Sequence, residues 1–283
     1  MKRKLLILIF ILFGVALFAQ EKEYVEKTFY SNRIINGHSI ENIPAGKLNF
    51  LLAHRMGRID DGFKTLFGLR QATSQINLEY GLSDRINVGI ATSTFQELYF
   101  GDVKFKLFKQ SVGKNSFPVA ISLHSTMFIN TGELNYPNNQ EYFSSRLYYS
   151  HQILIARKFN EKLSLQITPT AIHRNMVKTK SDKNQVYATG IGGRYKFTKK
   201  MALTFEYYYV FPNQIVSKIN NESVSNTFSL GVDIFTGKHV FQIFVTNSLA
   251  MDEKNFITEN IEKWDKKQIH IGFNISRLFR IKK

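Results

Sequence analysis

The stretch QINLEYGLSDRINVGIA, residues 75–91, decides the fold of this chain. Apolar and polar side chains alternate over residues 75–80, and after the connection GLSD (81–84) the alternation resumes. Successive side chains of a β-strand point to opposite faces, so this period of two predicts strands with one apolar and one polar face. A short connection that contains Gly, Ser and Asp predicts that the two strands form a hairpin.

The same alternation recurs along the chain, and with the hairpin strands it makes twelve segments. The others lie at 47–54, 103–107, 119–124, 147–155, 163–168, 187–197, 203–207, 228–234, 241–245 and 269–275. No sustained period of 3.6 residues competes with it. An even number of strands returns both chain ends to one side of a membrane, as single-chain bacterial barrels require.

The connections between these segments are short and long in turn. Short ones lie at 81–84, 109–116, 159–162, 198–200 and 237–238, and long ones at 57–71, 131–142, 175–184, 211–225 and 249–267; only 93–97 departs from the order. Outer-membrane barrels have short periplasmic turns and longer external loops. We therefore predict an all-β fold, a single antiparallel transmembrane β-barrel of about 12 strands at residues 46–283. A soluble β-sandwich is the alternative, but segments of membrane-spanning length and aromatic clusters near their ends favour the barrel.

The amino-terminal residues have the pattern of an export signal. Lys2, Arg3 and Lys4 precede an apolar stretch that ends in Leu-Phe-Ala at 17–19. We predict a signal peptide at 1–19, because the stretch is shorter than the ~20 residues of a spanning helix; a retained anchor is the alternative. Residues 20–45 are polar and are expected to form a periplasmic segment that tucks into or under the barrel. The predicted location is the cell outer membrane.

Composition narrows the possible partners. The chain has no Cys, which excludes disulfides, thiolate metal sites and a lipid-modified amino-terminal cysteine. Its formal net charge is +16, and three positive charges fall in the predicted signal. An exported chain without a recognition motif is not expected to bind nucleic acid. The expected partners are outer-membrane lipid, lipopolysaccharide, the barrel-assembly machinery and small anionic solutes.

Short motifs spread over the chain resemble those of a known family. They are NGHS at 36–39, the stretch 48–57 ending in HRMG, LFGL at 66–69, EYGLSDR at 79–85, HRN at 173–175, GKHVFQ at 237–242 and TNS at 246–248. The chain resembles a Bacteroidetes family of outer-membrane β-barrel proteins catalogued as a domain of unknown function. The resemblance implies a porin-like or transport-associated protein and supplies no catalytic residues.

The inner face of the barrel is where charged side chains are expected, because a charge facing lipid at the membrane midplane costs ~2–4 kcal/mol. The candidate lumen-lining residues are Glu79, Lys104, Lys106, Arg146, Arg174, Arg194, Lys196, Glu206 and Asp233. They could make a vestibule that favours anions at the periplasmic end, or they could pair and fill the lumen. We expect a non-enzymatic narrow channel or small-solute transport protein. A sealed structural or surface-interaction barrel is the alternative.

The sequence predicts no catalytic, cofactor or metal site. Its seven histidines are scattered, and no zinc helix, phosphate loop or dinucleotide fingerprint occurs. His124 and Ser125 are neighbours on one predicted strand, so their side chains point to opposite faces. A lipid-modifying outer-membrane enzyme, with a Ser–His site from separate strands, stays open as an alternative.

Overall fold

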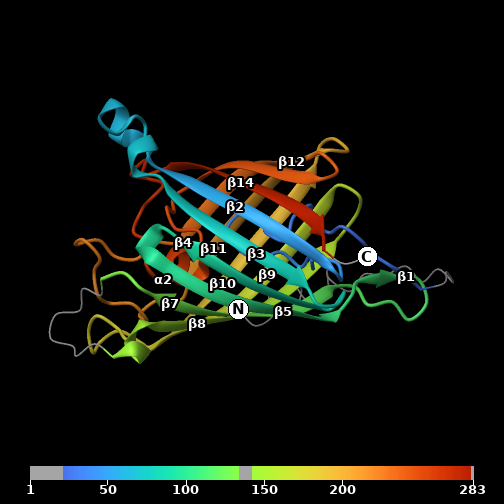
Figure 1. Ribbon diagram of the computed structural model, residues 1–283, viewed down its shortest axis with the longest axis horizontal. Helices are drawn as coiled ribbons and strands as arrows, with labels where there is room; N and C mark the ends of the chain where they lie inside the picture. Colours follow the sequence, from blue (N-terminus) through green and yellow to red (C-terminus); the bar gives the residue numbers. More distant parts are fainter. Residues whose placement is uncertain (1–21, 134–141, 282–283) are drawn as a thin grey trace, which may run out of the picture.

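Twelve strands form a closed antiparallel barrel, which confirms the predicted fold (Figure 1). The computed structural model describes residues 22–133 and 142–281; the predicted signal peptide at 1–19 lies outside them. The barrel strands are β2 (Lys47–Arg58), β3 (Thr73–Gly81), β4 (Ile86–Ser93), β5 (Leu98–Phe108), β7 (Ala120–Asn130), β8 (Leu147–Lys158), β9 (Leu163–Arg174), β10 (Gln185–Lys196), β11 (Met201–Val210), β12 (Thr227–Phe235), β13 (His239–Thr246) and β14 (His270–Arg280).

The barrel closes where its first strand pairs with its last. β2 and β14 are antiparallel, and their register runs from Lys47 opposite Arg280 to Arg58 opposite His270. Every other barrel strand pairs with its neighbours in the chain. Closure leaves no unpaired strand edge, which is the condition for a sheet to span lipid.

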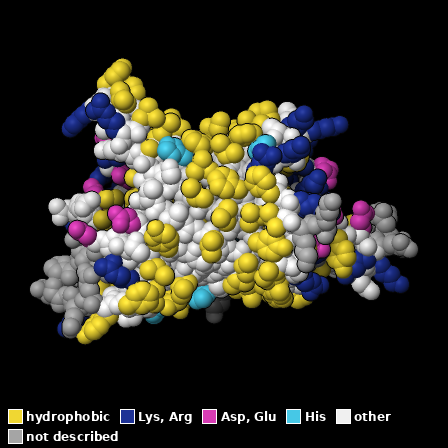
Figure 2. All heavy atoms as spheres, viewed as in Figure 1, with side chains coloured by type: hydrophobic (Ala, Val, Ile, Leu, Met, Phe, Trp, Pro, Cys, Tyr) yellow, Lys and Arg dark blue, Asp and Glu magenta, His cyan; other side chains and the backbone are white. Residues whose placement is uncertain are grey.

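The alternation seen in the sequence separates the two faces of the wall. In β8, Tyr148 and Leu154 are fully buried whereas Ile153, in the middle of the strand, is 43% exposed. Exposed apolar side chains recur on other strands and form a band between ends rich in charge (Figure 2). This distribution suits a barrel whose outer face meets acyl chains.

The two ends of the barrel differ in their connections. The end that we call the terminal end carries the start of β2, the end of β14 and all the short connections except the one between β4 and β5; the loop end carries the long connections (Figure 1). At the terminal end β1 (Glu23–Tyr24) pairs with β6 (Ser111–Val112). The long connections include the 3-10 helices η1 (Ile59–Thr65), η2 (Leu69–Gln71) and η4 (Phe143–Arg146) and the α-helix α2 (Glu253–Thr258). The 3-10 helix η3 (Phe95–Glu97) lies in the short loop between β4 and β5. Among the described residues, no helix has the length and apolar character needed to cross a membrane.

The outer band predicts the cost of a misplaced charge. Ile153→Arg should lower the free energy of unfolding by ~2–4 kcal/mol in lipid vesicles, because Ile153 lies at mid-strand. The matched control is Phe159→Arg, which changes a similarly exposed residue just beyond the end of β8 and should cost ~0–1 kcal/mol. Urea titration of both variants measures the difference, and equal costs would contradict a membrane-spanning β8.

Candidate functional site

The lumen of the barrel contains part of the amino-terminal segment. Residues 31–40, which we call the lumen hairpin, are all buried. The Ile34 N–H donates to the Gly37 carbonyl and the Ser39 N–H to the Asn32 carbonyl, both at 2.9 Å. The segment enters from the terminal end and returns through residues 41–46 to the start of β2. Residues 20–45 are expected to lie inside or beneath the barrel, and the lumen hairpin lies inside the barrel.

A carboxylate on the barrel wall holds the tip of the lumen hairpin. Glu206, on the inner face of β11, accepts backbone hydrogen bonds from Ile35 at 3.3 Å, Asn36 at 3.1 Å and Gly37 at 2.9 Å. A Cβ at Gly37 would lie 2.1 Å from the Tyr208 hydroxyl, so only glycine fits there without movement. Glu206 therefore holds the main chain of the tip, and the absence of a side chain at Gly37 allows the tip to pack against Tyr208.

Side-chain amides of the wall satisfy the hairpin's carbonyl groups. The donors come from β9, β13 and β14: Gln166 to the His38 carbonyl at 2.8 Å, Gln242 to that of Ile34 at 2.7 Å, and Asn274 to that of Ile35 at 2.8 Å. Buried backbone groups need such partners. Polar side chains of the inner face thus provide hydrogen-bond partners for the main chain of the hairpin, which does not pair with a barrel strand.

A second segment enters the lumen from the loop end. The connection between β13 and β14 turns inward, and every residue of α2 is buried. The Asp252 carboxylate accepts the Asn255 N–H at 3.0 Å and caps the helix. Glu253 Oε1 lies 3.6 Å from a guanidinium nitrogen of Arg33 and 3.6 Å from His38 Nε2. The two inserted segments therefore meet inside the barrel.

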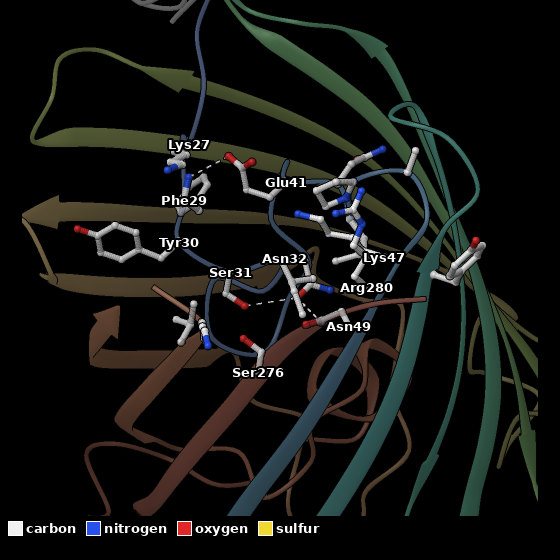
Figure 3. Close-up of a pocket in the computed structure, with 18 of the residues that line it drawn as sticks. Lys27, Phe29, Tyr30, Ser31, Asn32, Glu41, Lys47, Asn49, Ser276 and Arg280 are labelled. Atoms are coloured by element: carbon white, nitrogen blue, oxygen red, sulfur yellow. Dashed lines mark hydrogen bonds between the residues drawn. The ribbon is translucent and has the colours of Figure 1, made fainter. Parts of the chain in front are cut away.

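A cavity of about 1100 Å³ remains beside the hairpin at the terminal end (Figure 3). Its charged lining residues are Lys27, Glu41, Lys47, Lys238 and Arg280. Four cationic side chains face one carboxylate, so the cavity has an excess of positive charge.

The structure brings several of the sequence-predicted lumen residues into contact with the amino-terminal segment. Besides Glu206, these are Glu79, which lies 3.7 Å from Arg33; Lys104, which donates to the carbonyls of Ser39 at 3.1 Å and Glu41 at 3.0 Å; and Arg194, which donates to the Lys27 carbonyl at 3.1 Å. These residues contact the lumen hairpin or the residues that flank it, Lys27 and Glu41, and do not line an open passage.

The remaining predicted residues lie apart. Asp233 is buried and accepts from Gln242 at 2.9 Å, whereas Lys106 and Lys196 are half-buried near the terminal end. Arg174 ends β9 and donates to the Lys183 carbonyl at 2.7 Å. Arg146 differs from its predicted place on a strand face: it ends η4 at the loop end and donates to the carbonyls of Asn130 and Gly132, at 3.1 and 2.7 Å.

Three residues at the junction of the inserted segments were not among the predicted site residues: Arg33, His38 and Glu253. None belongs to an alternating segment, so strand periodicity could not place them. His38 stands in the NGHS motif, which supports the family resemblance and does not by itself indicate a site. The charged loop at 249–267 gave no sign that it turns into the lumen.

Two Ser–His pairs lie on the outer face of the wall. Ser125 Oγ is 3.0 Å from His151 Nδ1 across β7 and β8, and Ser74 Oγ is 2.8 Å from His54 Nδ1 across β2 and β3. The cross-strand neighbour of His151 on its other side is Ala171, which cannot orient an imidazole. The two similar pairs have the geometry of cross-strand polar contacts.

A buried aspartate joins two long connections at the loop end. Asp182 accepts the backbone N–H groups of Val216 at 2.7 Å and Ser217 at 2.8 Å, and that of Thr179 at 3.1 Å. Burial raises the pKa of Asp182, but these hydrogen bonds outweigh burial and hold the pKa below its usual value. The β9–β10 loop is thus fixed to the β11–β12 loop.

A family model described as a membrane bound beta barrel domain (DUF5777) matches residues 29–279. This chain belongs to that family. The match begins two residues before the lumen hairpin and ends one residue before the end of β14, so the family domain includes the lumen hairpin as well as the wall. No curated protein is significantly similar to this chain in sequence.

Solved structures of outer-membrane barrels share the fold. The KdgM porin in complex with disordered oligogalacturonate is 8% identical, with a TM-score of 0.50, and the match covers 82% of this chain and 99% of that one. The COG4313 outer membrane channel from Pseudomonas putida F1 is 15% identical, with a TM-score of 0.47, over 85% of this chain and 98% of that one. At 8% identity the likeness to the KdgM porin concerns the fold alone.

The contacts of Glu206 predict how firmly the hairpin is held. Glu206→Gln should speed hydrogen exchange of the amides at 35–37 about 10- to 100-fold, because a hydrogen bond to a charged group contributes ~1.5–3 kcal/mol. Exchange measured by mass spectrometry on the full chain tests this. Glu26→Gln, at an exposed position, is the control; unchanged exchange in the Glu206 variant would show that the carboxylate does not hold the tip.

The lowered pKa of Asp182 predicts a loop contact that acid weakens. An acid whose folded pKa lies below its unfolded value stabilises above the unfolded pKa, and this contribution is lost as pH falls through the folded pKa. Proteolysis at 211–226 should therefore be slow from pH 7 down to ~4 and faster at lower pH. Asp182→Asn should be cleaved about tenfold faster at pH 7 and respond little to acid. The same pH response in both proteins would exclude Asp182 as the titrating group.

Proposed function

We propose that this protein is a non-enzymatic outer-membrane channel or small-solute transport protein, which its own inserted segments close at rest. The lumen hairpin fills the barrel from the terminal end, and the β13–β14 connection fills it from the loop end. Transport then requires one or both segments to move. The observation that carries the proposal is the polar contact between the hairpin and the wall.

A polar contact of this kind can open at moderate cost. The wall holds the hairpin with carboxylate, amide and ammonium groups, and water can replace each of those hydrogen bonds when the segment moves. Ile34 and Ile40 add apolar contacts with side chains of β7 and β8, which favour the closed state. Twelve-stranded barrels lie between small barrels filled by side chains and wide porins, so removing both inserted segments would leave a narrow passage.

The charge of the residual cavity supports small anions as solutes. Lys27, Lys47, Lys238 and Arg280 line it with a single carboxylate, Glu41. A positive vestibule raises the local concentration of anions. The sequence analysis also favours an anion vestibule at this end, but on other residues: Lys106 and Lys196 do not line this cavity.

The fold type supports a placement in the outer membrane. Single-chain outer-membrane barrels have short periplasmic turns, so we assign the terminal end to the periplasm and the loop end to the exterior. Outer-membrane lipid, lipopolysaccharide and the barrel-assembly machinery are then its partners. The lipid-hydrolase alternative finds little support, because the outer-face Ser–His pairs resemble each other and His151 has no orienting acid opposite it.

A permanently sealed barrel is the second candidate function. It is favoured by the contacts of Glu253 with Arg33 and His38, since these join the two inserted segments inside the lumen. A barrel of this kind would serve structure or surface recognition and would pass no solute.

Conductance in planar bilayers separates the two functions. In one variant a Gly-Ser linker of equal length replaces residues 31–40, and in another a linker also replaces 250–260. We expect small or rare currents from the native protein and at least tenfold larger, anion-selective currents once the lumen is cleared. The control places the same linker at 59–68, in a loop that projects from the loop end, and should behave like the native protein (Figure 1).

Folding of every variant is checked by heat-modifiable mobility in gels. A folded double variant without current above background would overturn the channel proposal and leave the sealed barrel.

A further inference from the structure

The junction of the two inserted segments gathers metal-binding side chains from three elements. His38 comes from the lumen hairpin, His124 from β7 and Glu253 from α2. One ligand atom from each of the three lies within 4.8 Å of the others. The two imidazole rings are 3.6 Å apart between centroids, and all three residues are at most 2% exposed.

Several ligand atoms in this group have no hydrogen-bond partner. Among the described residues, His38 Nδ1, His124 Nε2 and Glu253 Oε1 are buried side-chain atoms without one. Leaving such atoms unpaired is costly, and a buried cluster of them needs an explanation. A cation bound here would satisfy His124 Nε2 and Glu253 Oε1, and it would also bind one ring nitrogen of His38.

The surroundings of His124 favour a cation on its free nitrogen. Gln152 Oε1 lies 3.2 Å from His124 Nδ1, and Gln152 Nε2 donates to Thr170 at 3.1 Å, so the amide oxygen faces the imidazole and accepts its N–H. The lone pair of a neutral His124 is then on Nε2, which lies 3.4 Å from Asp102 Oδ2. A lone pair facing a carboxylate is repulsive unless a cation or a proton lies between. The amide is also the kind of partner that orients a metal-binding histidine.

The net charge around the cluster is negative, which favours binding of a divalent cation. The carboxylates Glu79, Asp102 and Glu253 exceed the cations Arg33 and Lys104 by one negative charge when the histidines are neutral. Arg33 lies 3.6 Å from Glu253 Oε1, beyond a normal hydrogen bond, and it also has the Asn36 carbonyl at 3.2 Å. Arg33 can therefore keep a partner when Glu253 binds a metal.

We propose that His38, His124 and Glu253 bind a divalent transition metal, with Zn²⁺ as the best match, and that Asp102 lies beside the fourth position. Imidazole nitrogen and carboxylate oxygen are ligands that Zn²⁺ takes at about 2.0–2.2 Å. Two ligands of a tetrahedral zinc lie about 3.4 Å apart, close to the 3.6 Å between His38 Nε2 and Glu253 Oε1. The metal would join the lumen hairpin, the wall and α2 at one point. This inference stands whether the barrel transports a solute or is sealed.

Zinc retention by the untagged full-length protein tests the site. The detergent-purified protein is incubated with ZnCl₂, passed through a desalting column and analysed for metal. We expect about one zinc per chain for the native protein, and at least a fivefold loss in His38→Ala, His124→Ala and Glu253→Gln. His239→Ala, which removes a histidine from the terminal end of β13, should retain the native amount.

Two further measurements keep the outcome decisive. Heat-modifiable gel mobility shows that each variant is folded, and the isosteric Glu253→Gln preserves packing if an alanine variant fails. Co²⁺ in place of Zn²⁺ should give visible absorption typical of four-coordinate cobalt in the native protein only. A folded native protein that retains no zinc, or folded variants that retain as much as the native protein, would overturn the proposal. Neither result depends on conductance.

Discussion

The pairing of β2 with β14 is the constraint on which the rest of this structure depends. Lipid offers no hydrogen-bond partners, so a sheet can span a membrane only when its first and last strands satisfy each other. Twelve strands in a closed barrel set the width of the space that they enclose. Closure also gives the wall an apolar outer face and a polar inner face, because alternate side chains face lipid on one side and the enclosed space on the other.

The enclosed space explains the two inserted segments. The inner face carries Glu206, Gln242, Asn274 and similar groups, which are costly to bury without partners. The lumen hairpin supplies those partners through its main chain, since its N–H and carbonyl groups are not used in any strand. The connection that carries α2 enters the lumen from the loop end, and a cavity of about 1100 Å³ remains beside the hairpin at the terminal end.

The sequence predicts the wall well because period two is a local property. The alternation around residues 75–91 defines a hairpin without reference to any other strand, and the alternating connection lengths order the rest. Strand parity also places Glu79, Lys104, Arg194 and Glu206 facing inward. Strand parity does not predict the position of Arg146, because Arg146 is the last residue of η4 and β8 begins at the next residue.

The contents of the lumen could not be predicted in the same way. The hairpin is short and lacks a periodic pattern, and its residues are fixed by groups far away in the chain. Glu206 could be assigned to the inner face, but nothing local shows that it accepts three main-chain N–H groups. The cluster of His38, His124 and Glu253 exists only after three distant elements meet, so scattered histidines carry no signal of it.

The hairpin's contacts with the wall also bear on how the molecule reaches its native state. The hydrogen bonds from Asn36, Gln242 and Asn274 join residues separated by 170 to 239 positions. Contacts of such long range form late, because the entropy of closing large loops must be overcome first. The segment that leaves the ribosome before any strand is therefore ordered only when the last strand is in place. During biogenesis it must stay hydrated and unattached until the cylinder is complete.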